Sequence, residues 1–280
     1  MRTIPREGLS RAAIDRSFMR QQESSGGIDY TAHLQIPNDL TSLRNYFSQM
    51  SMVDDGVGRV LAALEQQGLA ENTLVIYSAD HGFSLGHNGF WGHGQATWPA
   101  NAHRAAYSIP LLVRHTGRVQ SGLVENRMIS QVDLFATIRD YLGMPETESN
   151  ANSASRSFAS LLRGESLDWD ADEVFIEQEE VRAVRTQEWL YVQRFKGSPE
   201  HPFGNELYDL VRDPSEHHNL IADAEYQNIA REFRDRVEAY FNEHAVPRYD
   251  LWRGGTTKSN SHKPAFWKSV WCADRAPVFD

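Results

Sequence analysis

Apolar residues recur every three or four positions between Leu40 and Leu64, and polar residues fill most of the positions between them. This spacing predicts one long amphipathic helix, which Gly68 closes as a C-terminal cap. A short apolar, β-branched run over residues 74–78 follows and predicts a strand buried on both faces. A helix joined to a strand by a short connection is half of a crossover unit, so we expect a parallel sheet.

Two further elements continue this α/β pattern. A second apolar run over residues 109–113 predicts another core strand, in which the proline lies near the start and costs no interior hydrogen bond. Ser130 and Asp133 have the spacing of a capping box and open a helix that Gly143 ends. Residues 158–162 add a short helical turn. We expect the helix to turn its apolar residues inward, namely Leu134, Phe135, Ile138, Tyr141 and Leu142.

The pattern changes after about residue 172. Short apolar runs are now separated by polar turns, which predicts an antiparallel meander. A final helix over residues 224–245, with Asp223 as its cap, has an apolar face that fits over such a small sheet. The runs that predict the strands are residues 174–176, 181–184, 189–192 and 207–210.

The same pattern divides the chain into four segments. Residues 1–37 are polar and weakly patterned, and residues 249–280 form a tail without a clear period. Between them, residues 38–165 read as an α/β core and residues 166–248 as a small α+β subdomain. The fold class is therefore α/β, a mostly parallel sheet between helices, with a small antiparallel sheet covered by a helix.

Composition excludes several classes of function. The 280 residues carry a formal net charge of −10 and no basic stripe, so nucleic acid is not an expected partner. Cys272 is the single cysteine, which excludes an internal disulfide framework and a cysteine-rich zinc site. No run of about 18 apolar residues predicts a membrane span. The first residues lack the apolar stretch of a signal peptide.

The candidate chemistry lies where the strand over residues 74–78 ends. Asp80 and His81 follow it directly, and ligands collect beyond the carboxyl ends of strands in open α/β sheets. A carboxylate and an imidazole side by side can bind one divalent metal if a turn aims them the same way, and Gly82 permits such a turn. The glycine-rich and aromatic loop over residues 82–108 is long enough to line a pocket. Asp54 and Asp55, in contrast, fit a solvated helix face.

The residues around Asp80 and His81 resemble the sulfatase family of the alkaline-phosphatase-like superfamily. The likeness runs in order through much of the chain, and residues 38–165 are similar to the C-terminal part of the family's α/β core. The segments that carry it are residues 53–61, 72–82, 109–114, 130–137 and 207–220.

This resemblance implies a hydrolase of sulfate esters that uses one divalent metal, usually calcium, with manganese or magnesium as alternatives. Asp80 and His81 match a pair of the family's metal ligands. His93 stands where the family has a lysine that contacts the sulfate, so it is the candidate catalytic residue and a donor to substrate. His81, His103 and Arg104 are further candidates for substrate binding, although for His87, His103 and His115 a structural role is favoured. The expected partner is a sulfated small molecule or carbohydrate.

One departure from the family stands out. The family makes its nucleophile from a Cys or Ser in the motif C/S-x-P-x-R, and neither Cys272 nor Ser108 lies in such a motif. The sequence resembles the second half of a sulfatase, completed by a missing or separate N-terminal half. A phosphodiesterase or phosphonate hydrolase of the same superfamily and a non-catalytic remnant are the alternatives. Family members are often exported, to the periplasm or the outside of the cell, but the residues leave localisation open.

Overall fold

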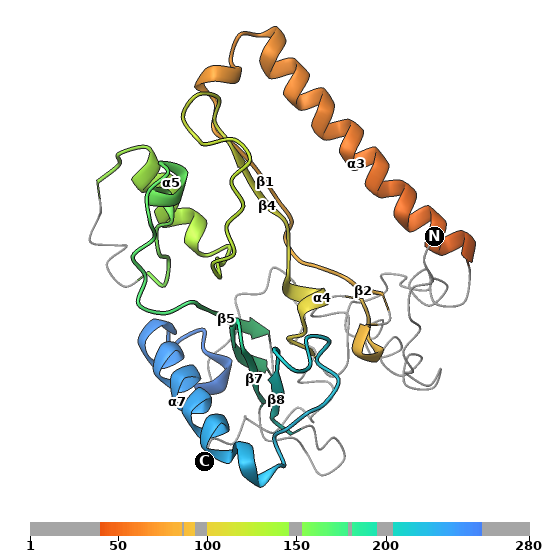
Figure 1. Ribbon diagram of the computed structural model, residues 1–280, viewed down its shortest axis with the longest axis vertical. Coiled ribbons are helices and arrows are strands. Elements are labelled where there is room, and N and C mark those ends of the chain that lie inside the picture. Colours follow the sequence, from red (N-terminus) through yellow and green to blue (C-terminus); the bar gives the residue numbers. More distant parts are fainter. Residues whose placement is uncertain are drawn as a thin grey trace.

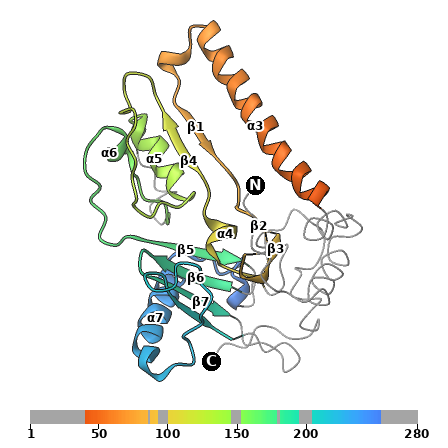
Figure 2. The same ribbon diagram turned by 45° about the vertical axis from the view of Figure 1, so that its right-hand side comes forward.

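The computed structural model separates the chain into an α/β part and a four-stranded sheet with its covering helix (Figure 1). The long helix α3 and the ribbon of β1 and β4 lie at one end, and the sheet with helix α7 lies at the other (Figure 2). None of the helices in the part of the chain it describes is both long and apolar enough to cross a bilayer. The structure describes residues 40–85, 87–92, 100–145, 153–178, 181–194 and 204–253.

Helix α3 spans Leu40–Gln66, as the apolar spacing predicts. Gly68 adopts φ +67° and closes the helix, with the amide of Leu69 donating to the carbonyl of Leu64. The apolar face is not buried as expected, because Val53 is 46% exposed and Val60 is 60% exposed. In the described residues, few side chains pack against this face.

Strand β1 (Val75–Ser78) pairs with β4 (Leu111–Arg114), and the pair is antiparallel. The expected parallel sheet is therefore wrong for these two strands, because the chain between them turns back on itself. Burial on both faces is also wrong. β1 is only half-buried, and Leu112 of β4 is 59% exposed. The short 3₁₀-helix η1 (Ala70–Asn72) joins α3 to β1.

The loop over residues 82–108 contains regular structure that its sequence does not predict. Strands β2 (Ser84–Leu85) and β3 (Trp91–Gly92) form a small antiparallel hairpin. The 3₁₀-turn η2 (His87–Gly89) joins them, and the short helix α4 (Arg104–Tyr107) precedes β4. These elements have two to four residues each, which is too short for a hydrophobic period to reveal.

One of the two reciprocal bonds of the predicted capping box is present at the start of helix α5 (Asp133–Tyr141), since the amide of Ser130 donates to the Asp133 carboxylate at 2.9 Å. The Ser130 hydroxyl instead accepts from the amide of Val132. Its apolar face is only partly covered, because Phe135 and Leu142 are 49% and 61% exposed rather than buried. The predicted turn at residues 158–162 is helix α6 (Ala159–Leu162), whose side chains pack against α5.

The four predicted strands form one antiparallel meander, which confirms the sequence pattern. Val181, Leu190 and Leu207 of this sheet are fully buried. On one face it carries the helix α7, and on the other it packs against Ala100 and Ala102. The strands are β5 (Glu173–Gln178), β6 (Val181–Thr186), β7 (Trp189–Arg194) and β8 (Glu206–Asp209).

The last helix is split at its start. Asp223 accepts a hydrogen bond from the amide of Glu225 and caps a 3₁₀-turn, η5 (Ala224–Tyr226), before α7 (Gln227–His244) begins. Three aromatic and aliphatic side chains of α7 are buried against the sheet, namely Phe233, Val237 and Phe241. The turn η6 (Leu251–Arg253) then lies against β6, where Arg182 donates to the buried Asp250 carboxylate at 2.7 Å.

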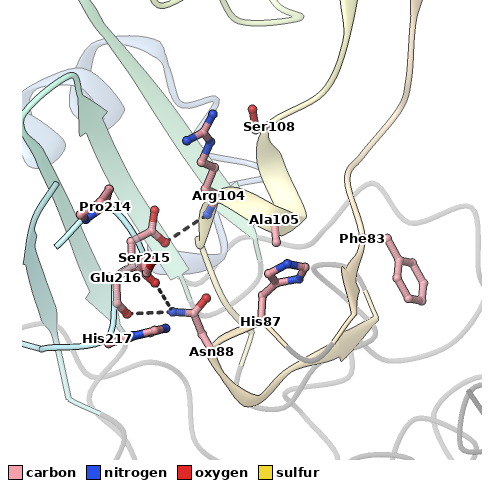
Figure 3. A pocket seen from close by; sticks show the side chains of 10 residues that line it. All are labelled: Phe83, His87, Asn88, Arg104, Ala105, Ser108, Pro214, Ser215, Glu216 and His217. Atoms are coloured by element: carbon pink, nitrogen blue, oxygen red, sulfur yellow. Dashed lines mark hydrogen bonds between the residues drawn. The ribbon is translucent and has the colours of Figure 1, made fainter. Parts of the chain in front are cut away.

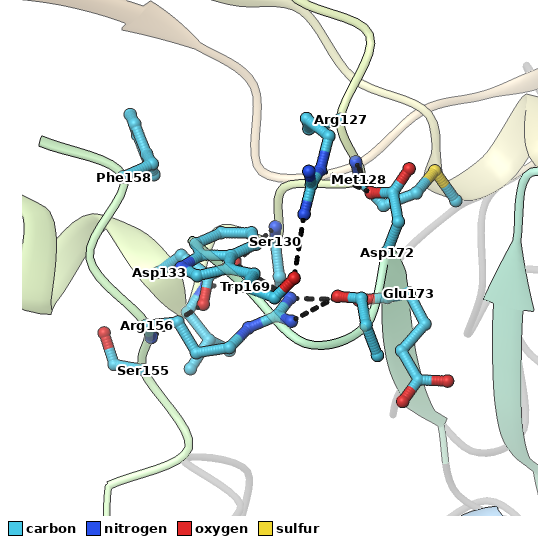
Figure 4. A network of polar contacts seen from close by, with 12 residues as sticks. Arg127, Met128, Ser130, Asp133, Ser155, Arg156, Phe158, Trp169, Asp172 and Glu173 are labelled. Carbon is cyan, nitrogen blue, oxygen red and sulfur yellow. Dashed lines mark hydrogen bonds and ion pairs between the residues drawn. The ribbon is translucent and has the colours of Figure 1, made fainter. Parts of the chain in front are cut away.

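A polar network ties helix α5 to the sheet (Figure 4). The buried carboxylate of Asp133 accepts from the backbone amide of Arg156 at 2.9 Å. The guanidinium of Arg156 donates to the carbonyls of Ala171 and Glu173 and lies 4.0 Å from the centre of the Trp169 ring. This network fixes α5 and the segment at Arg156 relative to β5. The boundaries placed after residues 37, 165 and 248 stay predictions.

Candidate functional site

Asp80 and His81 lie just beyond the end of β1, and their side chains face each other. The Asp80 Oδ2 and His81 Nε2 atoms are 3.6 Å apart, while Asp80 Oδ1 accepts from the His81 amide at 3.0 Å. The Asp80 side chain is 88% exposed and that of His81 41%. The backbone turn therefore brings the two groups to one side, where both are open to solvent.

The hydrogen bonds of His81 define which ring nitrogen can bind a metal. Its Nδ1 lies 2.8 Å from the carbonyl oxygen of Gly82, which can only accept, so Nδ1 carries the proton. In the neutral ring the lone pair is then on Nε2, next to the Asp80 carboxylate, as a shared cation requires. A histidine whose second nitrogen is held by a carbonyl is common among metal ligands. These donors fit part of a metal's coordination shell.

Two donors do not complete that shell. Calcium takes about six to eight oxygen ligands. Among the residues that the structure describes, no three or more His, Cys, Asp or Glu side chains are grouped to hold an ion. Asp54 and Asp55 are exposed on α3, as expected for a solvated face.

A pocket of about 770 Å³ opens beside this pair, and we call it the Asp80 pocket. Its walls come from α4, from the segment before α5 and from the start of the C-terminal sheet. Among its lining residues are three arginines, Arg104, Arg127 and Arg185. The Asp80–His81 pair and three cationic side chains therefore share one cavity, which suits an anionic ligand bound together with a metal ion.

Gly82 positions α4 against the end of β1. Its amide donates to the carbonyl of Ala106 at 2.8 Å, and a Cβ atom at Gly82 would lie 2.3 Å from the carbonyl oxygen of Ala105. The glycine is therefore needed for close approach to α4, a role that the sequence does not predict. The contact places Arg104, the first residue of α4, beside Asp80 and His81.

Glu216 is a functional candidate that the sequence does not single out. It is 3% exposed and adopts φ +59°, which is unusual for a residue other than glycine. One carboxylate oxygen accepts from His103 Nδ1 at 2.8 Å and from the Arg104 amide at 3.1 Å, and the other is 2.7 Å from the guanidinium of Arg185. A single buried carboxylate thus joins the start of α4 to strand β6.

The environment of Glu216 favours its charged form. Burial by itself would raise the pKa of this carboxyl group, but the hydrogen bond from His103 and the charge of Arg185 outweigh it and hold the pKa below its usual value of 4.5. The negative charge is therefore compensated inside the fold by groups that contact it directly.

A second pocket of about 420 Å³ shares Arg104, Ser108 and Pro214 with the Asp80 pocket, and we call it the His87 pocket. His87, Arg104 and Glu216 are among its lining residues (Figure 3). Asn88 closes one side, because its amide donates to the carbonyls of Ser215 and Glu216 at 2.9 and 2.8 Å. The small hairpin is thereby fastened to the turn after β8, and Arg104 lines both pockets.

The other candidate histidines have different surroundings. His93 lies outside the described residues, so its role stays a prediction. His103 is 4% exposed and lines neither pocket, since Glu216, Phe90 and Tyr208 surround its ring. His115 is also buried, with Nδ1 2.7 Å from the Tyr141 hydroxyl and Nε2 3.2 Å from the Glu71 carbonyl, which agrees with a structural role.

Two family profiles match the chain. The profile described as Sulfatase matches residues 13–144. The profile described as N-sulphoglucosamine sulphohydrolase, C-terminal, matches residues 101–243. Together they include β1, both pockets, the meander and nearly all of α7.

Among curated proteins, the chain is 26% identical over 205 residues to N-acetylglucosamine-6-O-sulfatase of Bacteroides thetaiotaomicron, covering 70% of this chain and 35% of that protein. It is 28% identical over 225 residues to Delta 4,5-hexuronate-2-O-sulfatase of the same bacterium. This match covers 77% of this chain and 44% of that protein. The chain therefore spans less than half the length of these relatives.

Solved structures have the same fold at low identity. The complex of BT4656 with its substrate D-glucosamine-2-N,6-O-disulfate has a TM-score of 0.63 at 22% identity, covering 72% of this chain and 41% of that one. The phosphonate monoester hydrolase SpPMH from Silicibacter pomeroyi has a TM-score of 0.66 at 20% identity. The match covers 90% of this chain and 53% of that one. Since the second profile alone matches half of the chain, the family is established: this chain is a member of the sulfatase family, within the alkaline-phosphatase-like superfamily.

Proposed function

We propose that this chain is the C-terminal part of a metal-dependent sulfatase whose substrate is a sulfated carbohydrate. The observation that carries the proposal is the placement of Asp80 and His81, 3.6 Å apart and open to the Asp80 pocket. The names of the two curated relatives support a sugar sulfate as substrate, because both are sugar sulfatases.

In this proposal each side chain has a distinct role. Asp80 supplies a carboxylate oxygen and His81 supplies Nε2 to a divalent cation, which we propose to be calcium. When bound, the cation neutralises charge on the sulfate oxygens. Arg104 donates hydrogen bonds to the same anion from the wall of the pocket. His103 acts through Glu216 to hold the start of α4, and His93 takes the place of the family's lysine.

The catalytic constellation needs more than these residues. The 280 residues contain no C/S-x-P-x-R motif, and two ligands hold a cation weakly. We therefore propose that the nucleophile and the remaining ligands come from an N-terminal half, whether part of a longer chain or a separate polypeptide. Accordingly, we expect no turnover of an aryl sulfate by these 280 residues alone.

The metal site can be tested with Mn²⁺ as a paramagnetic probe. We expect millimolar Mn²⁺ to broaden the amide NMR signals around residues 80–82 in the wild-type chain, because weak binding suffices for this effect. Asp80→Asn removes the charged ligand and should abolish the broadening. Asp54→Asn removes another exposed carboxylate, on α3, and serves as the matched control.

Two outcomes of this experiment would contradict the proposed metal site. Equal broadening in wild type and Asp80→Asn would mean that the cation does not bind at this pair. Broadening spread over the acidic surface in all three proteins would mean non-specific binding. Either result would favour a non-catalytic role for this chain.

A phosphonate or phosphate ester hydrolase is the second candidate. The observation that favours it is structural, since a phosphonate monoester hydrolase covers 90% of this chain at a TM-score of 0.66, slightly above the sugar-sulfate complex. Sulfate and phosphonate groups are both tetrahedral oxyanions that an arginine can bind. Parallel turnover of an aryl sulfate and an aryl phosphonate by the completed protein discriminates between them.

A further inference from the structure

Arg104 differs from the other two arginines that line the pockets. Arg127 has a carboxylate partner in Asp172 at 3.5 Å, and Arg185 has one in Glu216 at 2.7 Å. For the Arg104 guanidinium, the described part of the chain contains no acidic partner. An exposed arginine at a pocket wall without a counter-ion is well placed to bind an anion from solution.

His87 presents a second hydrogen-bond donor to the same cavity. Its Nδ1 accepts from the backbone amide of Leu85 at 3.2 Å, so this nitrogen carries no proton. The proton of the neutral ring is therefore on Nε2, which makes Nε2 a donor. The side chain is exposed and lines the His87 pocket together with Arg104.

The walls of the His87 pocket are held in place by hydrogen bonds. Asn88 fastens the hairpin to the turn at residues 215–216, and Glu216 fastens that turn to the start of α4. The charge of Glu216 is compensated by Arg185 and by the hydrogen bond from His103, so its repulsion of a bound anion is reduced. The pocket therefore has fixed walls, an arginine with no acidic partner among the described residues, and a ring N–H donor.

We propose that the His87 pocket binds a second anionic group of the substrate, a neighbouring sulfate or carboxylate on the same sugar, through Arg104 and His87. This inference rests on the proposed function and adds to it a preference for substrates with two anionic groups. Arg104 lines both pockets, so it lies between the two groups. A volume of about 420 Å³ accommodates such a group with part of its sugar ring.

The substrate in the BT4656 complex carries two sulfates, so it is a suitable probe. We would titrate the metal-free chain, in the presence of EDTA, with D-glucosamine-2-N,6-O-disulfate and with D-glucosamine-6-O-sulfate. We expect the disulfate to shift the NMR signals of residues 87–89 and 104–108. Arg104→Gln should weaken disulfate binding about tenfold, because a charged, two-pronged hydrogen bond is lost. Arg104→Lys should retain part of the affinity.

Arg118→Gln is the matched control, since Arg118 is exposed and lines neither pocket. An equal loss in Arg118→Gln, or no difference between the mono- and disulfated sugars, would overturn the inference. So would an absence of signal shifts at residues 87–89. Because EDTA removes the cation, this result is independent of the Mn²⁺ experiment, and the two proposals can fail separately.

Discussion

At the scale of single residues, Glu216 joins the most segments around the site. Its carboxylate contacts His103, Arg104 and Arg185, and its side chain is 2% exposed. Removing one partner of a buried ion pair is costly because the other charge is left uncompensated. Glu216→Gln keeps the shape but loses the charge facing Arg185. We expect it to lower the free energy of unfolding at pH 7 by about 3 kcal/mol in urea denaturation.

The pH dependence of that loss follows from the depressed pKa of Glu216. The stabilisation is fully present above the unfolded pKa near 4.5, and it is lost as pH falls toward the lower folded value. The difference between wild type and Glu216→Gln should therefore be constant near neutral pH and shrink below pH 4.5. Glu243→Gln, an exposed residue at the end of α7, should show neither effect. A pH-independent difference would contradict the assignment.

At the scale of elements, α4 is positioned by its contact with Gly82. A methyl group there would lie 2.3 Å from a backbone carbonyl, so α4 or the end of β1 must move. We expect Gly82→Ala to destabilise the chain by about 1–3 kcal/mol and to displace Arg104. Gly56→Ala is the matched control, because nothing lies within 4 Å of its Cβ and alanine favours a helix. Equal stability of both variants would argue against a close approach at Gly82.

The elements also show which features a sequence can predict. The meander and the cap at Asp133 were predictable because alternation and capping boxes are local signals. The antiparallel pairing of β1 with β4 could not be predicted. Which strands pair depends on the path of the 32 residues between them, and no local pattern reveals that path. The pair Asp80 and His81 was predictable from its place after a strand. The contacts of Glu216 with His103 and Arg104 were not predictable, because they join residues more than 100 positions apart.

At the scale of the whole molecule, the two parts of the fold are unequally packed. The C-terminal sheet buries Val181, Leu190 and Val192 completely against the segment at Ala100, and it buries Val184 and Leu207 completely against α7. In α3, by contrast, Met52 is 74% exposed, and the β1–β4 ribbon has only two strands. A two-stranded ribbon is only marginally stable by itself. The relatives have more than half of their length outside this match, which is where further packing partners for the α/β part would come from.

This asymmetry predicts the order of local unfolding. Amide hydrogens of β6 and β7 should exchange most slowly, because they lie in the centre of the sheet under α7. Those of α3, β1 and β4 should exchange faster, since fewer buried contacts oppose their opening. Hydrogen–deuterium exchange followed by mass spectrometry measures both in one sample. Adding an N-terminal half that packs on α3 should slow exchange in α3 and β1 while leaving β6 and β7 unchanged. Slow exchange throughout α3 in the chain alone would mean that its apolar face is already covered.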